Sequence, residues 1–445
     1  MPRLFETSAS STTYDVVIVG AGPSGSACAY WLARAGWSVC LIEKKQFPRE
    51  KTCGDGLTPR SVHQLAQMGL EGTVARHGHR YEGLRSFGFG ASLEMNWPQH
   101  PIFPNYGYTV TRFNLDGLVA EQAEAHGAVL LTGVEAVSLL EPSESTSGGL
   151  RAATGVIVNE KETGATAEVR GRYLVAGDGQ NSRLGRELGT MRNREWPMGM
   201  ALRGYYTSDR HDEPWIESHL DIRDPQGNVV PGYGWIFPLG DGRVNVGVGL
   251  LSTAGAWKGV NTTKLQEHFV AQAAEAWGLN ATTCLGPATG GRLPMGLSVG
   301  PRVGANTLVI GDAAGAVNPM NGEGIAYGYE TGRLAAGVLG EALLANDPSA
   351  LALYEERLDS AYRDYYRVAR AFVRVISEPR ILTACVALGL RVEPLMRELL
   401  KIMANLMSND SRGVGELGYR GLVRLADVIP ERAYALLLGN LTSDE

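Results

Sequence analysis

The chain has 445 residues, with 41 Lys and Arg against 47 Asp and Glu, a net charge of −6. This length is large for one core and predicts two or three connected domains. The acidic balance argues against nucleic acid as a partner. The five cysteines are scattered and form no CxxC pair, so we expect neither a disulfide framework nor a metal site, and we expect a reducing compartment.

The sequence also argues against export and against a membrane span. Residues 1–13 are largely polar and have no apolar signal-peptide core, so we expect a flexible N-terminus. The longest apolar run, 381–390, is shorter than the roughly 18 residues that cross a bilayer. We therefore expect a cytoplasmic protein.

The segment 14–43 has the order of a dinucleotide-binding unit. An apolar strand at 16–19 leads into a GxGxxG motif and an Ala-rich helix, and a second strand at 38–42 ends at Glu43. Glycine motifs alone are weak signals, but one flanked by strand, helix and a strand-end acid indicates a nucleotide site.

Each residue of this motif has a separate role. Gly20 makes a tight turn, Gly22 lets the backbone approach a pyrophosphate, and Gly25 lets the helix pack on the strand. The helix N-terminus presents free amides to the phosphates. Glu43 is expected to bind ribose hydroxyls.

A second motif near residue 310 decides which dinucleotide is bound. The strand 308–310 leads to Asp312, and a helix begins near Gly322, Gly324 and Ile325. This order resembles the second FAD fingerprint of the p-hydroxybenzoate hydroxylase-like flavoproteins. The resemblance implies FAD as the cofactor, with Asp312 on the ribityl chain and the helix start at the flavin edge.

A third element and the remaining patterns define the fold. YLVAGDGQNSRLG at 173–185 resembles the middle DG motif of the same superfamily. Strand-like runs fill 198–249, and helical periodicity dominates after about residue 346. We predict an α/β fold: a Rossmann-like FAD-binding domain with an inserted, mostly antiparallel β-sheet substrate domain and a helical C-terminal cap. The expected boundaries are 14–75, 105–185 and 286–345 for the FAD-binding domain, 76–104 and 186–285 for the substrate domain, and 346–445 for the helical region.

Two further segments narrow the family. FPREKTCGDGLTPR at 47–60 and PGYGWIFPLGDGRVNVGVG at 231–249 resemble the geranylgeranyl reductase family, as do Gly315 and Glu323 where aromatic hydroxylases have His and Gln. Members of this family saturate isoprenoid double bonds with reduced FAD. Within it, the chain is most similar to the bacterial menaquinone reductases, which implies saturation of one isoprene unit of the menaquinone side chain.

Other functions remain open on the sequence. The nearest alternative is reduction of geranylgeranyl diphosphate or a geranylgeranyl lipid. An FAD-dependent aromatic monooxygenase or halogenase is a second alternative, although WIFP departs from the halogenase Trp-x-Trp-x-Ile-Pro segment. A non-catalytic flavin-binding redox sensor is a third.

The chemistry of an isolated alkene suggests which residues act. Protonation develops positive charge on carbon, so the reaction needs an apolar tunnel and an acid. Tyr233 and Trp235 are predicted to line the tunnel, since aromatic faces tolerate a developing cation. Cys53 is our candidate for proton delivery or substrate positioning, and its alternative role is a small buried apolar residue. Asp55 and Glu323 are alternative proton sources, unless they only cap a loop or a helix.

The family resemblance implies further cofactor contacts. It places the loop containing Cys53, Gly54 and Gly56 near the isoalloxazine. It assigns Arg112 to the cofactor, the alternative being a surface ion pair with the neighbouring Asp116. Backbone groups at Val134 are expected to meet adenine.

The expected partners follow from the substrate. We expect a polyprenyl lipid or quinone, and an electron donor that is NADPH, ferredoxin or reduced quinone, because no second complete GxGxxG marks a nicotinamide domain. Residues 360–401 carry eight basic groups against four acids within amphipathic helices. These helices either dock on the anionic inner face of the cell membrane, making the protein peripheral there, or only pack on the body of the protein.

Overall fold

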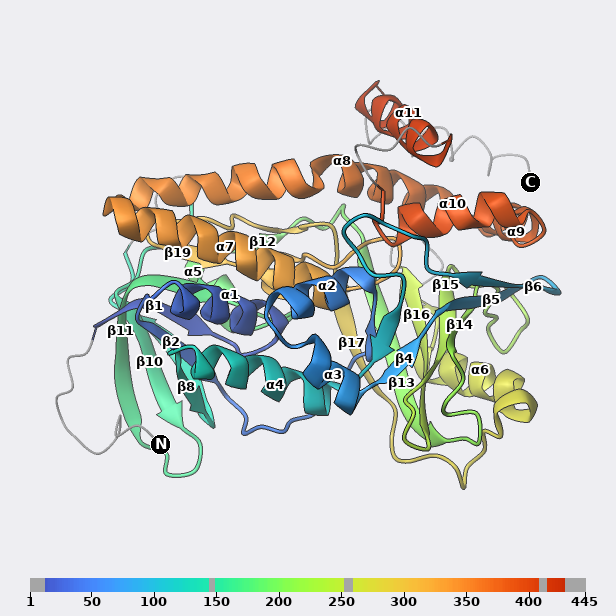
Figure 1. Cartoon of the computed structure of the whole chain (residues 1–445), viewed down its shortest axis with the longest axis horizontal. Helices are drawn as coiled ribbons and strands as arrows, with labels where there is room; N and C mark the ends of the chain where they lie inside the picture. The colour runs from blue at the N-terminus through green and yellow to red at the C-terminus, as the bar shows by residue number, and fades with distance from the viewer. Residues whose placement is uncertain (1–12, 144–148, 252–258, 408–413, 429–445) are drawn as a thin grey trace.

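The computed structural model describes residues 13–143, 149–251, 259–407 and 414–428 (Figure 1). The flexible N-terminus expected at 1–13 lies outside these ranges except for its last residue. Two large sheets lie side by side in the fold, and helices from the C-terminal part of the chain cover both (Figure 1).

The first sheet has the strand order β8-β2-β1-β11-β10-β9, and β19 also pairs with β11. Strands β8, β2, β1, β11 and β19 are parallel, whereas β10 is antiparallel to its neighbours. The strands are β1 (Thr13–Val19), β2 (Val39–Glu43), β8 (Val129–Thr132), β9 (Val134–Leu140), β10 (Gly155–Glu160), β11 (Thr166–Ala176) and β19 (Thr307–Val309).

The sequence of β1 explains its central position. Residues 16–19 are all apolar and all buried, as a parallel strand covered on both faces requires. Helix α1 contacts both α4 and α7. A Cβ at Gly332 of α7 would lie 2.2 Å from the Ser24 carbonyl oxygen of α1, so glycine permits this close crossing. The helices of this half are α1 (Pro23–Arg34), α2 (Pro59–Gln67), α3 (Glu71–His77), α4 (Arg112–Ala125), α5 (Arg183–Leu188) and α7 (Ile325–Ala345), with the 3-10 turn η2 (Gly311–Ala314).

The second sheet has the order β17-β13-β16-β15-β14-β5-β6. Its pairings are antiparallel except for the parallel pair β14 and β5. Its elements are β5 (Gly83–Gly88), β6 (Ala91–Asn96), β13 (Met198–Thr207), β14 (Trp215–His219), β15 (Gly232–Pro238), β16 (Arg243–Leu251), β17 (Thr289–Pro294) and the packed helix α6 (Thr262–Trp277).

One boundary differs in detail from the expectation. Strand β17 falls within 286–345, the segment that we assigned to the FAD-binding domain, yet it pairs with β13 in the second sheet. The chain returns to the first sheet only at β19, so this segment contributes to both. Two small sheets complete the strands: β3 (Gly56–Leu57), β4 (His79–Tyr81) and β7 (Gly107–Thr109) form one, and β12 (Met191–Arg192) and β18 (Val299–Gly300) form the other.

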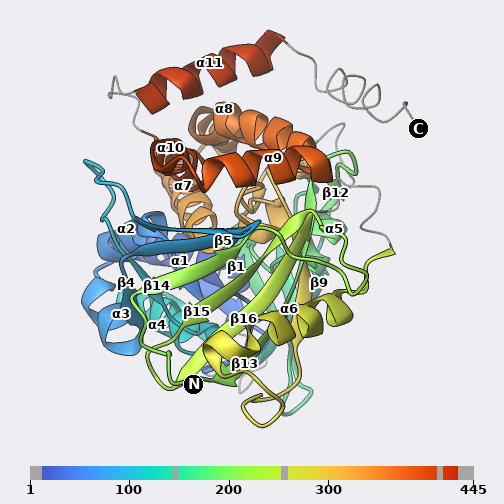
Figure 2. The same ribbon diagram turned by 90° about the vertical axis from the view of Figure 1, so that its right-hand side faces the viewer.

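The C-terminal helices cover the second sheet. Apolar side chains of α9 and α10 join those of β5, β6 and β14 in one buried cluster, and α11 lies outside α8 (Figure 2). The elements are η3 (Pro348–Ala352), α8 (Leu353–Ile376), α9 (Pro379–Gly389), α10 (Glu393–Met403) and α11 (Val414–Val428). The predicted fold class is confirmed.

A buried polar cluster holds the end of α10 to the first half of the molecule. Arg60 of α2 pairs with Glu330 of α7 at 2.7 Å and donates to the Asn405 carbonyl at 2.8 Å. The Tyr362 hydroxyl of α8 also donates to Glu330 at 2.7 Å. The Arg60–Glu330 pair therefore joins α2, α7, α8 and the residues that follow α10.

Replacing Arg60 with Ala should lower the free energy of unfolding by ~3 kcal/mol or more, because it leaves a buried carboxylate without its partner. Urea denaturation measures the change. Arg363→Ala is the control: it breaks an exposed pair with Asp359 and should cost less than ~1 kcal/mol. Equal losses in the two variants would contradict the role given to Arg60.

Candidate active site

The glycine motif brings three backbone segments into contact. Gly20 has φ of +100°, and a Cβ there would lie 2.4 Å from the Gly177 carbonyl oxygen of the DG motif. A Cβ at Gly25 would lie 1.9 Å from the Gly20 carbonyl oxygen. Neither position can carry a side chain without moving backbone, so the tight turn and the close helix contact predicted for these glycines are present.

Gly22 differs because its surroundings are open. Among the described residues, a Cβ there would have only the Arg112 Nη2 atom within 4 Å, at 3.9 Å, and φ is not in the left-handed region. No side chain of the described residues caps the N-terminus of α1, so its first amides are available to an anion. The site therefore fits the pyrophosphate of FAD. Protein packing does not require glycine at position 22, whereas the close approach of a ligand would.

Glu43 is buried at the end of β2, and its carboxylate accepts hydrogen bonds from three groups of the protein. The amides of Ala21 and Lys45 donate to it at 3.2 and 3.1 Å, and Arg49 pairs with it at 3.2 Å. Val134 opens β9 nearby, since the amide of the preceding Gly133 donates to the Lys45 carbonyl. The residues predicted for the ribose and adenine are thus neighbours.

Arg112 pairs with Asp116, the partner that we considered as its alternative. Both oxygens of Asp116 accept from the Arg112 guanidinium, at 2.5 and 2.6 Å. The pair is buried, with side chains 8% and 0% exposed, so it is not the surface contact that the alternative assumed. Asp116 also pairs with Arg49 at 2.9 Å. Arg112 reaches toward Gly22 from this fixed position, and its contact with the cofactor stays a prediction.

Asp312 belongs to the turn η2, and its side chain lies close to the start of α7. A Cβ at Gly324 would lie 3.2 Å from its Oδ1 atom. Gly324 is the N-cap of α7, Ile325 is its first residue, and no side chain of the described part of the chain caps it. Lys51 also lies within electrostatic reach of Asp312, and burial lowers the pKa of this lysine.

The loop containing Cys53 is fastened to the second sheet. The Cys53 backbone carbonyl accepts hydrogen bonds from the Asn245 side chain at 2.9 Å and from the Arg203 guanidinium at 3.2 Å. Asp55 has φ of +65°, and its carboxylate accepts from the Tyr205 hydroxyl and the Asn245 amide, at 2.6 and 2.8 Å. Burial raises the pKa of Asp55, and these hydrogen bonds oppose the rise.

An aromatic wall on β15 faces this loop. A Cβ at Gly54 would lie 3.5 Å from Trp235 Nε1 and 3.3 Å from Phe237, and one at Gly56 would lie 3.1 Å from Phe237. The indole lies against Gly247 of β16, where a Cβ would be 2.2 Å from the ring. Its Nε1 atom donates to Asn245 at 2.9 Å.

Tyr233 continues the wall toward the start of α7. Its hydroxyl donates to the Asn321 carbonyl at 2.7 Å and lies 3.6 Å from the Cβ position of Gly322. The rings of Tyr233 and Trp235 are 5.8 Å apart. The fold thus brings the predicted catalytic residues Cys53, Tyr233 and Trp235 to one place, although their catalytic roles remain predictions.

The acidic groups near this wall differ in their proton affinity. Burial raises the pKa of Cys53, and the Asp55 carboxylate adds to the rise, so the thiol is the prevailing form at neutral pH. Burial also raises the pKa of Tyr233. Burial raises the pKa of Glu323 to about 7.

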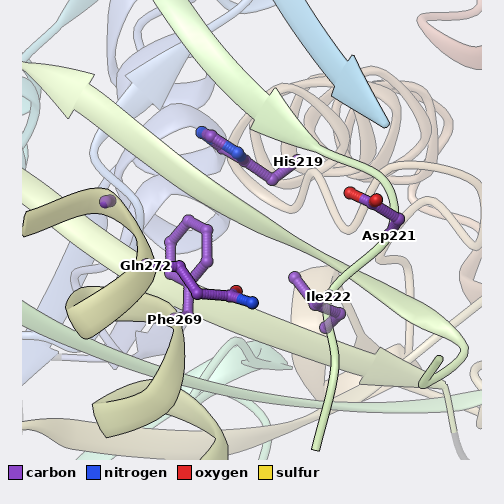
Figure 3. A pocket seen from close by; sticks show the side chains of 6 residues that line it. His219, Asp221, Ile222, Phe269 and Gln272 are labelled. Carbon is purple, nitrogen blue, oxygen red and sulfur yellow. The ribbon is translucent and has the colours of Figure 1, made fainter. Parts of the chain in front are cut away.

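A small pocket elsewhere on the second sheet is separate from this site. It is lined by His219, Asp221, Ile222, Phe269, Gln272 and Ala273 (Figure 3). Phe269 of α6 packs on Gly234 and Ile236, which alternate along β15 with Tyr233 and Trp235 and so occupy the opposite face. The pocket therefore belongs to the α6 side of the sheet.

The comparisons with known proteins agree with this geometry. The FAD binding domain family matches residues 13–231. A menaquinone reductase of Mycobacterium tuberculosis is 41% identical over 418 residues, 94% of this chain and 97% of that protein. A digeranylgeranylglycerophospholipid reductase of Methanopyrus kandleri is 31% identical, covering 82% of this chain and 91% of its own. The chain belongs to the geranylgeranyl reductase family.

Solved structures show the same fold at lower identity. A geranylgeranyl bacteriochlorophyll reductase-like protein from Thermoplasma acidophilum has a TM-score of 0.69 and 20% identity, covering 96% of this chain and 99% of that one. A flavin-dependent brominase has a TM-score of 0.65 and 19% identity, covering 94% and 99%. The predicted family and the predicted cofactor, FAD, are confirmed, and the chain is an FAD-dependent oxidoreductase.

Several residues that build this geranylgeranyl reductase site were missed in the sequence. Arg49 bridges Glu43 and Asp116, and Asn245 joins Trp235 to the loop containing Cys53. Arg49 lies in the segment that carries the family resemblance, which was a usable signal. Asn245 lies in the second segment that carries the resemblance, 231–249, but its partner Cys53 is 192 residues away, so the contact between them could not be read from the sequence.

Gly22→Val should weaken FAD binding at least about tenfold, a cost of ~1.4 kcal/mol, by filling the space expected for the pyrophosphate. The folded apoprotein should keep its melting temperature, because the nearest atom is 3.9 Å from the new Cβ. Flavin absorbance per chain and calorimetry measure the two effects. Gly25→Ala is the contrast and should destabilise the apoprotein itself. Full FAD occupancy in the Gly22 variant would contradict the placement of the pyrophosphate.

Proposed function

We propose that this protein saturates isoprenoid carbon–carbon double bonds, and that its substrate is one isoprene unit of the menaquinone side chain. The observation that carries the proposal is the 41% identity that extends over 97% of the mycobacterial menaquinone reductase. The loop containing Cys53 and the aromatic wall of β15 support it, because an apolar tail needs an apolar surface beside the flavin.

The residues of the site have distinct tasks in this proposal. Reduced FAD, when bound, supplies a hydride to the substrate. Trp235 and Tyr233 hold the alkene, and their ring faces stabilise positive charge that develops on carbon. The amides at the start of α7 would lie at the edge of the bound flavin and favour negative charge there. Asn245 bonds both the indole and the loop opposite it, so one side chain links the two, and Arg203 and Tyr205 help to hold the loop.

Reduction of a geranylgeranyl lipid is the second candidate. The observation that favours it is the 31% identity to the digeranylgeranylglycerophospholipid reductase over 91% of that protein. Both substrates present the same trisubstituted alkene on a polyprenyl chain, so the reacting end of the site serves either. The higher identity to the menaquinone reductase favours menaquinone over a geranylgeranyl lipid as the substrate.

Producing the protein in a host that makes unsaturated menaquinone should yield quinones heavier by two mass units per saturated bond. Mass spectrometry of extracted quinones and lipids measures this, with the Gly22→Val variant as the control that lacks cofactor. A gain of sixteen mass units would indicate oxygen insertion and refute the reductase proposal. Saturation confined to phospholipid chains would favour the second candidate.

We further propose that the protein docks on the membrane through its last helices. Within the described ranges, no helix is long and apolar enough to cross a bilayer. Five of the ten large apolar side chains that are exposed in these ranges lie between 388 and 422, at the end of α9, on α10 and on α11. These are Leu388, Val392, Leu395, Leu417 and Leu422. We call this set the apolar docking patch.

Basic charge contributes less to docking than the sequence suggests. Arg363, Arg397 and Lys401 pair with acids one helical turn away, and Arg370 is buried over the Trp196 ring. Arg380, at the start of α9, and Arg391, just after its end, are exposed. Each cation near an anionic surface contributes ~1 kcal/mol, so the two assist the apolar contact.

Flotation with vesicles containing anionic lipid tests the docking patch. Replacing Leu388 and Leu395 with Glu should weaken vesicle binding at least about tenfold, since each leucine contributes ~1 kcal/mol or more on burial. Leu344→Glu is the matched control, because Leu344 is 79% exposed but lies at the end of α7. Wild-type binding that is absent at every lipid composition, or equal binding in the double variant, would refute this surface.

A further inference from the structure

Glu323 is a buried carboxyl group that is only half satisfied. Its Oε1 atom accepts from the hydroxyls of Thr58 and Ser61, the latter at 3.0 Å. Its Oε2 atom is buried and has no hydrogen-bond partner among the described residues. Since both donors are on Oε1, a proton on this group resides on Oε2.

The position of Glu323 ties it to the reacting end of the site. It precedes Gly324, the N-cap of α7. The preceding turn is closed by a backbone hydrogen bond, in which the Asn318 N–H donates to the Glu323 main-chain carbonyl at 2.9 Å. Tyr233 of the aromatic wall donates to Asn321 in the same turn. The carboxyl group is bonded to Thr58 and Ser61 at the start of α2, and it is close enough to Tyr233 of the wall to act on the pKa of that hydroxyl.

The other acidic groups near the wall are either held in hydrogen bonds or too weakly acidic. Asp55 accepts three donors, from Tyr205, Asn245 and the Arg112 amide. The hydroxyl proton of Tyr233 is donated to the Asn321 carbonyl. Cys53 has a raised pKa and is a weak acid at neutral pH. Of these four groups, Glu323 is the one with a carboxyl oxygen that has no hydrogen-bond partner among the described residues.

The ionisable groups around Glu323 act in opposite directions. Burial raises its pKa to about 7, Glu330 adds to the rise, and Thr58, Arg60 and Ser61 oppose it. The other titratable groups that face it are phenols from four elements, which stay neutral at these pH values. They are Tyr81 of β4, Tyr233 of β15, Tyr327 of α7 and Tyr366 of α8.

We propose that Glu323 is the proton donor of the reaction, giving its Oε2 proton to the less substituted alkene carbon. The O–H bond of Glu323 breaks as the new C–H bond forms with the alkene π electrons. The hydride of the proposed function completes the saturation at the other carbon, and water returns a proton to the carboxylate. An acid that titrates near working pH is suited to this step, since it is protonated yet gives up its proton readily. This inference rests on the proposed reductase function.

The test compares wild type with Glu323→Gln, which keeps the shape and removes the acid. Both proteins are loaded with FAD and reduced by dithionite, and saturation of a polyprenyl quinone is followed from about pH 5 to about pH 9. We expect wild-type activity to fall above about pH 7. The variant should lose at least about a hundredfold, the size of a general-acid contribution, with unchanged FAD content. Cys53→Ser is the matched comparison and should keep the wild-type pH profile.

A second readout is independent of turnover. Because the folded-state pKa of Glu323 is raised, its contribution to stability is present at low pH and is lost as pH rises through about 7. The melting temperature of the wild-type holoprotein, relative to Glu323→Gln, should therefore fall between about pH 5 and about pH 8. Infrared spectra should show a protonated carboxyl band at low pH that the variant lacks.

The outcomes separate the two proposals. If wild type saturates no isoprenoid at any pH, the reductase proposal fails, whatever Glu323 does. If wild type is active and Glu323→Gln retains both its rate and its pH profile, the proton-donor inference is refuted. Loss of the pH profile in Cys53→Ser, with Glu323→Gln unchanged, would assign the proton to Cys53 instead.

Discussion

The site depends on one buried carboxylate that joins the two halves of the molecule. Asp55 accepts from the Arg112 amide at the start of α4, from Tyr205 of β13 and from Asn245 of β16. The first donor belongs to the nucleotide-binding half and the other two to the second sheet. Asp55 also holds a left-handed backbone conformation, which aspartate tolerates better than most residues. The loop that carries Cys53 is positioned by these bonds, and the aromatic wall is aligned through the same Asn245.

A second set of charges fixes the nucleotide-binding end. Glu43, Arg49, Asp116 and Arg112 form a buried chain of alternating charges, each side chain less than one-tenth exposed. Two acids and two bases cancel, so this chain gives the cofactor phosphates no net positive charge. We therefore expect the uncapped amides of α1 to have the larger share in binding those phosphates. Removing any one member would leave a buried charge unpaired, which is costly.

The predictions from sequence succeeded where the signal was local. The tight turn at Gly20 and the close helix contact at Gly25 are read from a short pattern, and the strand and helix periods around them fix the fold. The pyrophosphate role of Gly22 stays a prediction. The contacts to Cys53 from Arg203 and Asn245 span 150 and 192 residues, and no local pattern announces them. Asp55 and Glu323 were equivalent acids in the sequence, and only their hydrogen-bond partners distinguish them. The pairing of basic groups in α8 and α10 was visible as i,i+3 and i,i+4 spacing, so the share of unpaired cations in that segment could have been judged lower from the sequence.

The contact between Trp235 and Gly247 has a consequence for how this family can diverge. The indole rests where any side chain at Gly247 would have to be, so the two positions share one fixed volume. A lineage that keeps the tryptophan keeps the glycine. A larger residue on β16 becomes tolerable only after the ring on β15 has shrunk. Drift at either position is therefore conditional on the other, and the order of the two substitutions is constrained.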